Sequence, residues 1–168
     1  MILLNHKKLT VIVLFLIINL SLVAQNKNQT KENCGTTLNK DSQIKEMETN
    51  QKNVLGTNLQ LASLDPITGF FRTGFCATDS KDRGVHVVAA VVTDEFLKYS
   101  LSQGNDLISP YPANGFPGLK AGNVWCLCAL RWKEALNADV APPVILEATN
   151  IKALEYITLE ELQKHAVK

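Results

Sequence analysis

The feature that most constrains the fold of this chain is the apolar run from Val85 to Val92, which is valine and alanine apart from one histidine. A short run rich in β-branched residues is typical of a strand buried on both faces. Thr93 directly after it is a favourable helix N-cap, and Gly104 is a favourable helix end. We therefore predict a buried strand followed at once by a helix over residues 94–103. The predicted inner face of this helix consists of Phe96, Leu97, Leu101 and, as a further candidate, Tyr99.

The sequence predicts further short elements beyond this pair. Residues 123–129 are typical of a second strand, and residues 131–137 of a helix with Trp132 on its apolar side. The Pro142-Pro143 pair interrupts regular structure, because proline has no backbone N–H to donate. Residues 144–148 then favour a third strand.

Two helix starts follow near the C-terminus. Thr158 and Glu161, three residues apart, form a capping-box pattern that predicts a final helix, and Asn150 or Thr149 is suited to cap a shorter one. Residues 105–122 hold three prolines and three glycines and predict a long loop. Together these patterns predict one small α+β domain, in which a few-stranded sheet is covered by short helices.

The N-terminus predicts an exported protein. Lys7 and Lys8 precede an apolar run from Leu9 to Ala24, and polar Gln25 follows. This arrangement is typical of a cleavable signal peptide, here residues 1–24. An uncleaved membrane anchor is the alternative, although the run is shorter than the roughly 20 residues of a spanning helix. We expect a periplasmic or secreted protein that contacts the membrane only if the signal is retained.

Residues 25–52 are rich in polar side chains and hold few large apolar ones, so we predict a polar, flexible linker. The folded body then spans residues 53–168, the size of one ordinary domain. It carries ten Lys and Arg against twelve Asp and Glu, a net charge of −2, without a basic cluster. Nucleic acid is therefore not an expected partner, because phosphate binding depends on clustered basic residues.

The body contains several segments of unusual composition. They are Asp65-Pro66-Ile67-Thr68-Gly69-Phe70-Phe71-Arg72, Thr93-Asp94-Glu95-Phe96-Leu97, Gly104-Asn105-Asp106-Leu107, Phe116-Pro117-Gly118-Leu119, Trp125-Cys126-Leu127-Cys128, Arg131-Trp132-Lys133-Glu134-Ala135 and Ala141-Pro142-Pro143-Val144. In these segments the chain resembles the bacterial domain of unknown function 2237 family over nearly all of residues 53–166. The resemblance implies a compact domain with helices and strands, and it implies no activity.

The body contains three cysteines, for which three interpretations stand. In a strand, Cys126 and Cys128 project from the same face, because side chains alternate. In the first interpretation Cys126 and Cys128 are small buried apolar residues. In the second, one of these two forms a disulfide with Cys76. In the third, all three cysteines bind zinc together with His86. The zinc interpretation is weakened by the Cys-x-Cys spacing, which is closer than in usual zinc sites. No other cofactor is expected.

The candidate ligand-binding residues are Arg72, His86, Asp106, Trp125 and Arg131. Both arginines neighbour aromatic residues in the sequence, and a guanidinium can donate two parallel hydrogen bonds to a carboxylate or phosphate. The same arginines are also suited to structural pairs with Asp65 or Asp106 that would anchor a loop.

These residues support three hypotheses about function. We expect a non-enzymatic binding module for a small anionic ligand or a partner protein. The first alternative is a thiol redox or metal-binding protein that uses Cys76, Cys126 and Cys128. The second is an enzyme with Cys76 and His86 as a reactive pair. The sequence alone leaves open whether any catalysis occurs.

Overall fold

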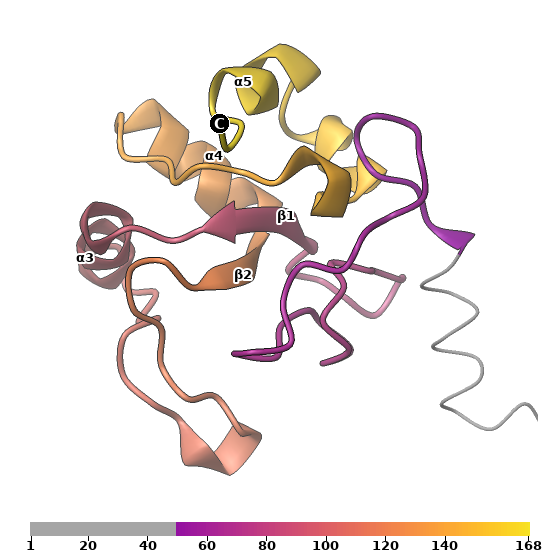
Figure 1. Ribbon diagram of the computed structural model, residues 1–168. Helices are drawn as coiled ribbons and strands as arrows, with labels where there is room; N and C mark the ends of the chain where they lie inside the picture. Colours follow the sequence, from indigo (N-terminus) through magenta and orange to yellow (C-terminus); the bar gives the residue numbers. More distant parts are fainter. Residues whose placement is uncertain (1–49) are drawn as a thin grey trace, which may run out of the picture. The chain divides into compact units, whose positions relative to one another are not determined.

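The computed structural model describes residues 50–168, which belong to one compact unit; the predicted signal peptide and the predicted linker up to residue 49 lie outside the described residues. In chain order the elements are β1 (His86–Val91), α3 (Asp94–Ser102), the 3₁₀ helix η1 (Pro112–Asn114), β2 (Val124–Cys128), α4 (Ala129–Asn137), the 3₁₀ helices η2 (Leu146–Ala148) and η3 (Ile151–Glu155), and α5 (Leu159–Lys164) (Figure 1). This part of the chain is a small α+β domain, as predicted. None of its helices is long and apolar enough to cross a membrane.

The sheet consists of β1 and β2, which run antiparallel with Ala89 opposite Cys126 and Val91 opposite Val124. Both strands lie where the apolar runs predicted them. At the start of β1 the register shifts between His86 and Val88. Such an irregularity redirects the side chains beside it, and His86 is one of the candidate site residues.

The third strand predicted over residues 144–148 is wrong. Val144 makes only isolated bridges, one to Ala90 of β1 and one to Ala166, and the chain turns into η2 two residues later. The hydroxyl of Thr149 donates to the carbonyl oxygen of Ile145 at 2.8 Å, which closes this turn. A local side-chain hydrogen bond thus competes with the sheet ladder.

Helix α3 begins as predicted, since the Thr93 side chain accepts a hydrogen bond from the backbone N–H of Phe96. Phe96 is buried, but Leu101 is 47% exposed, so its predicted place on the inner face is wrong. Ser100 is buried instead, because its hydroxyl donates to the carbonyl oxygen of Asn105 at 2.8 Å and satisfies its polarity there.

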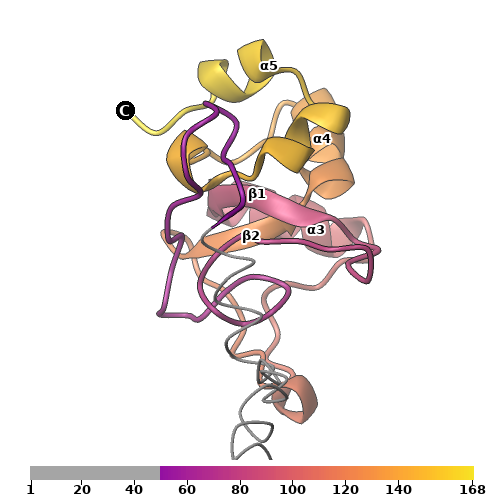
Figure 2. The same ribbon diagram turned by 90° about the vertical axis from the view of Figure 1, so that its right-hand side faces the viewer.

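The main core packs between the strands and the helices that cover one side of them (Figures 1 and 2). Trp132 of α4 is fully buried, and its indole N–H donates to the carbonyl oxygen of Pro142 at 3.0 Å. Helix α5 starts with the predicted capping box of Thr158 and Glu161. Its Leu162 is fully buried in the same core.

Residues 51–85, called the loop region below, contain isolated bridges but no helix or longer strand. Buried polar side chains hold this region in place. The amide of Asn53 donates to the carbonyl oxygen of Glu147 at 3.0 Å and accepts from the backbone N–H groups of Leu55 and Thr57. The Gln51 side chain also accepts a backbone hydrogen bond from the loop region. The ordered body therefore includes Gln51.

Candidate functional site

A cavity of about 380 Å³ lies between the loop region, the strands and the segment that joins α3 to β2. That segment extends on the side of the strands away from α5 (Figures 1 and 2). Four of the five predicted ligand-binding residues line the cavity, namely Arg72, His86, Asp106 and Trp125. The aromatic side chains of Phe70, Tyr111 and Phe116 complete most of its wall. We call this cavity the Arg72 pocket.

Arg72 contributes a cation that lies over an aromatic ring. Its guanidinium carbon lies 4.9 Å from the centroid of the Trp125 ring, which packs edge-on against Phe116 at 5.3 Å. The backbone of Arg72 has φ 57°, a conformation that costs a non-glycine residue about 1–3 kcal/mol. The rest of the fold therefore supports a strained backbone at the residue that brings positive charge into the pocket.

His86 is held by a carboxylate beneath it. Its Nδ1 lies 2.7 Å from Oδ1 of Asp82, and its backbone N–H donates to Oδ2 at 2.8 Å. The hydroxyl of Thr78 donates to the same Oδ2 at 3.0 Å. The Asp82 side chain is fully buried, whereas the His86 side chain is 42% exposed. Asp82 thus orients an imidazole that still reaches the pocket.

The backbone before His86 is shaped around its ring. A Cβ at Gly84 would lie 2.3 Å from Cε1 of His86, so only glycine fits there. Val85 has φ 48°, which is unusual for a β-branched residue. Phe70 stacks on the imidazole, with 6.4 Å between ring centroids and 12° between planes. The loop region and β1 together fix the plane of the imidazole.

Asp106 lies in the pocket wall, and its carboxylate accepts hydrogen bonds from the backbone of its own loop. Its Oδ1 accepts the backbone N–H groups of Ile108 and Ser109, both at 2.9 Å. The hydrogen bonds from Ser109, and then the one from Ile108, hold the pKa of the Asp106 carboxyl below its ordinary value. Asp106 anchors its loop and is not paired with Arg72 or Arg131.

Of the three interpretations of the cysteines, the structure confirms the disulfide. Cys76 and Cys126 are bonded to each other and buried, and Cys126 also lines the Arg72 pocket. The hydroxyl of Thr68 accepts the backbone N–H of Cys126 at 2.8 Å. Both contacts fasten the loop region to β2. Cys128 is a free thiol at the end of β2, half-buried and opposite His86 in the ladder.

This disulfide removes two ligands from the zinc site that the sequence suggested. Two of its thiols, those of Cys76 and Cys126, are engaged in the disulfide and cannot act as thiolate ligands in this state. Among residues 50–168 no group of three or more His, Cys, Asp or Glu side chains is arranged to hold a metal ion.

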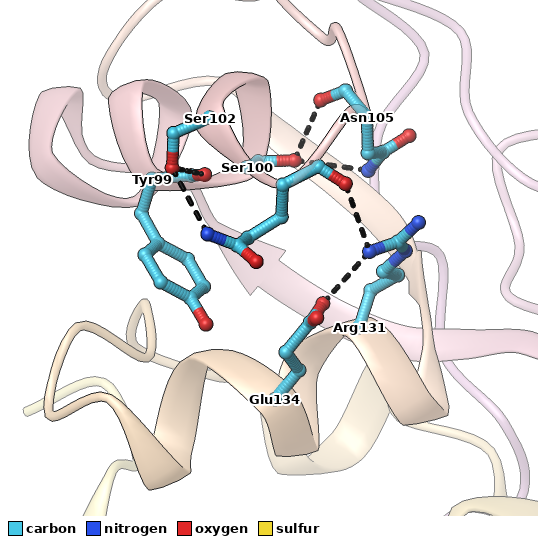
Figure 3. Close-up of polar contacts among 7 residues, drawn as sticks. Tyr99, Ser100, Ser102, Asn105, Arg131 and Glu134 are labelled. Atoms are coloured by element: carbon cyan, nitrogen blue, oxygen red, sulfur yellow. Dashed lines mark hydrogen bonds and ion pairs between the residues drawn. The ribbon is translucent and has the colours of Figure 1, made fainter.

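Arg131, the fifth predicted ligand-binding residue, lies outside the Arg72 pocket. Figure 3 shows its guanidinium between α3 and α4, where it pairs with Glu134 at 2.9 Å and donates to the carbonyl oxygen of Gln103 at 3.5 Å. Beside it, Ser100 and Asn105 are joined by hydrogen bonds at the end of α3. Arg131 therefore ties two helices together.

A model of a known protein family matches most of the chain. The family model described as "Uncharacterized protein conserved in bacteria (DUF2237)" matches residues 52–166. The chain belongs to this family. The match confirms the resemblance read from the sequence, and it includes every residue named in the Arg72 pocket. A search of curated proteins gave no match.

Sequence reasoning missed Asp82 and Thr68 as residues that build the site. Asp82 and His86 are four residues apart, but the chain between them forms a turn and not a helix, so no regular element predicts their contact. Thr68 contacts Cys126 across 58 positions of the chain. The only local signal was the small polar segment before β1, which is typical of many turns.

Proposed function

We propose that the protein binds a small organic anion in the Arg72 pocket, with Arg72 contacting the anionic group. The observation that carries this proposal is the Arg72 guanidinium over the Trp125 ring in the cavity wall, with its carbon 4.9 Å from the ring centroid. Within residues 50–168, Arg72 takes part in no ion pair. A guanidinium that lies over an aromatic ring can still donate hydrogen bonds from its N–H groups to a carboxylate or phosphate.

The other charges around the pocket support a single anion. The Asp82 carboxylate is buried under His86 and already accepts three hydrogen bonds. The Asp106 carboxylate accepts two backbone N–H groups. Both negative charges are therefore stabilised by the protein, while the positive charge of Arg72 is left without a partner among the described side chains.

The size and wall of the pocket indicate the body of the ligand. A cavity of about 380 Å³ is at the lower end of the range for small-molecule sites. Phe70, Phe116 and Trp125 present ring surfaces that favour a flat apolar group. We propose a ligand with one anionic group and one aromatic or similarly flat body.

Titration of the intact protein with benzoate tests this proposal, with benzyl alcohol as the uncharged probe of similar shape. The indole N–H signals in nuclear magnetic resonance spectra report the site, because Trp125 lines the pocket and Trp132 is buried in the core. Benzoate is expected to shift the Trp125 signal and leave Trp132 unchanged. Benzyl alcohol is expected to have a much weaker effect.

Two arginine variants form a matched pair for the same titration. Arg72→Gln is expected to weaken benzoate binding by about 10- to 100-fold, the usual value of a charge-assisted hydrogen bond. Arg131→Gln is the control, since Arg131 lies between α3 and α4. Equal binding of benzoate and benzyl alcohol, or equal losses in both variants, would contradict the proposal.

We also propose that the protein is exported. The support is the basic and apolar N-terminus together with the Cys76–Cys126 disulfide, since disulfides persist mainly in oxidising compartments. Mass spectrometry of the protein from cells tests this. Cleavage after Ala24 and two oxidised cysteines are expected in the exported fraction, and a full-length chain with reduced cysteines would contradict export.

A further inference from the structure

We infer that the Arg72 pocket also carries an activity, in which His86 transfers a proton of a bound aromatic 2-oxo acid and so interconverts its keto and enol forms. This inference rests on the proposed anion site, because Arg72 must hold the carboxylate of the substrate. His86 is the catalytic residue, and Asp82 is a positioning residue that acts through it.

The hydrogen bond to Asp82 determines which ring nitrogen of His86 carries the proton and which keeps a lone pair. A carboxylate only accepts hydrogen bonds, so Nδ1 of His86, 2.7 Å from Oδ1, carries the proton of the neutral ring. The lone pair is then on Nε2. Oδ2 of Asp82 is held by the backbone N–H of His86 and by the Thr78 hydroxyl. This arrangement prepares Nε2 to accept a proton, as in general-base histidines.

Several features of the fold serve the orientation of this one ring. Gly84 leaves space that any side chain would fill, and Val85 adopts φ 48°. Phe70 stacks nearly parallel to the imidazole, with 12° between the ring planes. Strained and space-limited backbone beside a cavity is characteristic of functional sites. A histidine with only a structural role would not need to remain 42% exposed in the pocket wall.

The chemistry follows from the groups that line the pocket. The substrate carboxylate pairs with Arg72, and the aromatic ring lies against Phe116 and Trp125. Nε2 of His86 accepts a proton from the carbon next to the ketone. The C–H electron pair becomes the carbon–carbon double bond, and the carbonyl π pair moves to oxygen as an enolate. The imidazolium then returns its proton to that oxygen, giving the enol, or to carbon, giving back the ketone.

This proton transfer needs neither an oxidant nor a covalent intermediate. The cysteine that lines the pocket is Cys126, which is bonded to Cys76 and offers no thiolate for attack. The predicted Cys76 and His86 pair is therefore replaced by an Asp82 and His86 pair, which supports acid–base chemistry.

Proton exchange of phenylpyruvate in deuterated buffer tests the inference. The methylene signal of phenylpyruvate is followed by proton nuclear magnetic resonance, with and without the intact protein. Loss of this signal faster than in buffer alone is expected. His86→Gln is expected to lower the protein-dependent rate by at least about 100-fold, the usual contribution of a general base. His165→Gln, at the other histidine of the described part, is expected to retain the rate.

The Asp82→Asn variant separates positioning from folding. It is expected to lower kcat by about 10-fold or more with KM for phenylpyruvate unchanged, since binding depends on Arg72. If Asp82 had only a structural role, Asp82→Asn would lower the amount of folded protein and would cause no selective fall in kcat at unchanged KM.

The outcomes distinguish this inference from the proposed anion site. Phenylpyruvate that shifts the Trp125 signal but exchanges no faster than in buffer overturns the activity and leaves the anion site standing. Exchange that survives in His86→Gln also overturns it. If benzoate binds and phenylpyruvate does not, the substrate class is wrong; if neither binds, both proposals fail.

Discussion

Residues 86–168 and the loop region are held in shape by different interactions. From β1 to α5, large apolar side chains such as Phe96, Trp132 and Leu162 are fully or almost fully buried. In the loop region Leu61, Leu64 and Ile67 are all exposed, with Leu64 at 61%. Val54 and Leu59 are buried, but most of the order there depends on buried polar groups and on one disulfide. The two parts share a domain but differ in their main source of stability.

The difference matters because the pocket spans both parts. Trp125 and His86 come from the strands, whereas Phe70 and Arg72 come from the loop region. The apolar core can keep the strands in place without keeping Arg72 over Trp125. Ligand binding should therefore be more sensitive to changes in the loop region than to changes of equal energy in the core.

Removal of the disulfide is expected to have the largest effect. In the chain-entropy account, a cross-link across a separation of 50 residues contributes about 4 kcal/mol to the free energy of unfolding. Cys76→Ala combined with Cys126→Ala should lose about that much in urea unfolding, and benzoate binding should be lost as well. Cys128→Ala is the matched control and should change neither. A double variant that binds benzoate normally would show that the loop region is ordered without the cross-link.

A cavity in the apolar core should have nearly as large an effect on stability but none on binding. Leu162→Ala is expected to lower the free energy of unfolding by about 3 kcal/mol, because Leu162 is fully buried. The control is Leu130→Ala at a leucine that is 60% exposed, where less than about 0.5 kcal/mol is expected. Benzoate affinity measured well below the unfolding transition should be unchanged in both variants. A large loss of affinity in Leu162→Ala would erase the distinction between the two parts.

The elements that could be predicted from the sequence are those specified by neighbouring residues. The valine run gave β1 at His86–Val91, and Thr93 and Thr158 capped α3 and α5 as expected. The third strand failed because residues 146–148 close a turn through Thr149, a contact that competes with the local apolar pattern. Local chemistry predicts helix starts well, while strand pairing depends on distant partners.

The site was predictable in its residue types but not in its assembly. Arg131 and Arg72 both neighbour aromatic residues in the sequence, yet only Arg72 stacks on Trp125 in the pocket. Strand alternation could not decide whether Cys126 or Cys128 pairs with Cys76, because it treats the two alike. The long-range position of the loop region decides both questions, and no periodic pattern encodes it.

A smaller effect is expected from the loss of one of the polar contacts between the two parts. Thr68→Val removes the acceptor for the backbone N–H of Cys126, which is buried. An unpaired buried N–H costs about 2 kcal/mol. Thr73→Val is the control, because the buried Thr73 hydroxyl has no hydrogen-bond partner among the described residues, and it should be neutral or stabilising. Urea unfolding measures both, and equal destabilisation would mean that the Thr68 contact is not what fastens the loop region to β2.

The smallest expected effect is electrostatic and confined to the part from β1 to α5. The ion pair with Lys133, and then the backbone N–H of Thr158, lower the pKa of the Glu161 carboxyl from its ordinary value of 4.5. A carboxyl with a lowered folded-state pKa stabilises the protein fully above the unfolded value, and this stabilisation is lost as the pH falls through the lowered one. Glu161→Gln keeps a capping acceptor but removes the charge, so it should cost about 0.5 kcal/mol at pH 7 and nothing in strong acid.

Unfolding of wild type and Glu161→Gln over a pH series measures how the difference in their free energy of unfolding disappears as the pH falls. The control is Glu147→Gln, because Glu147 is exposed and forms no ion pair among the described residues. Benzoate affinity at pH 7 should not change in Glu161→Gln, because α5 contributes no residue to the pocket. A change in affinity with so small a change in stability would mean that α5 is coupled to the pocket. Since the loop region carries Arg72, two routes for that coupling are present. One passes through the strands to Thr68 and the disulfide, and the other passes through the contacts of Asn53 and Val54 with residues 147–149.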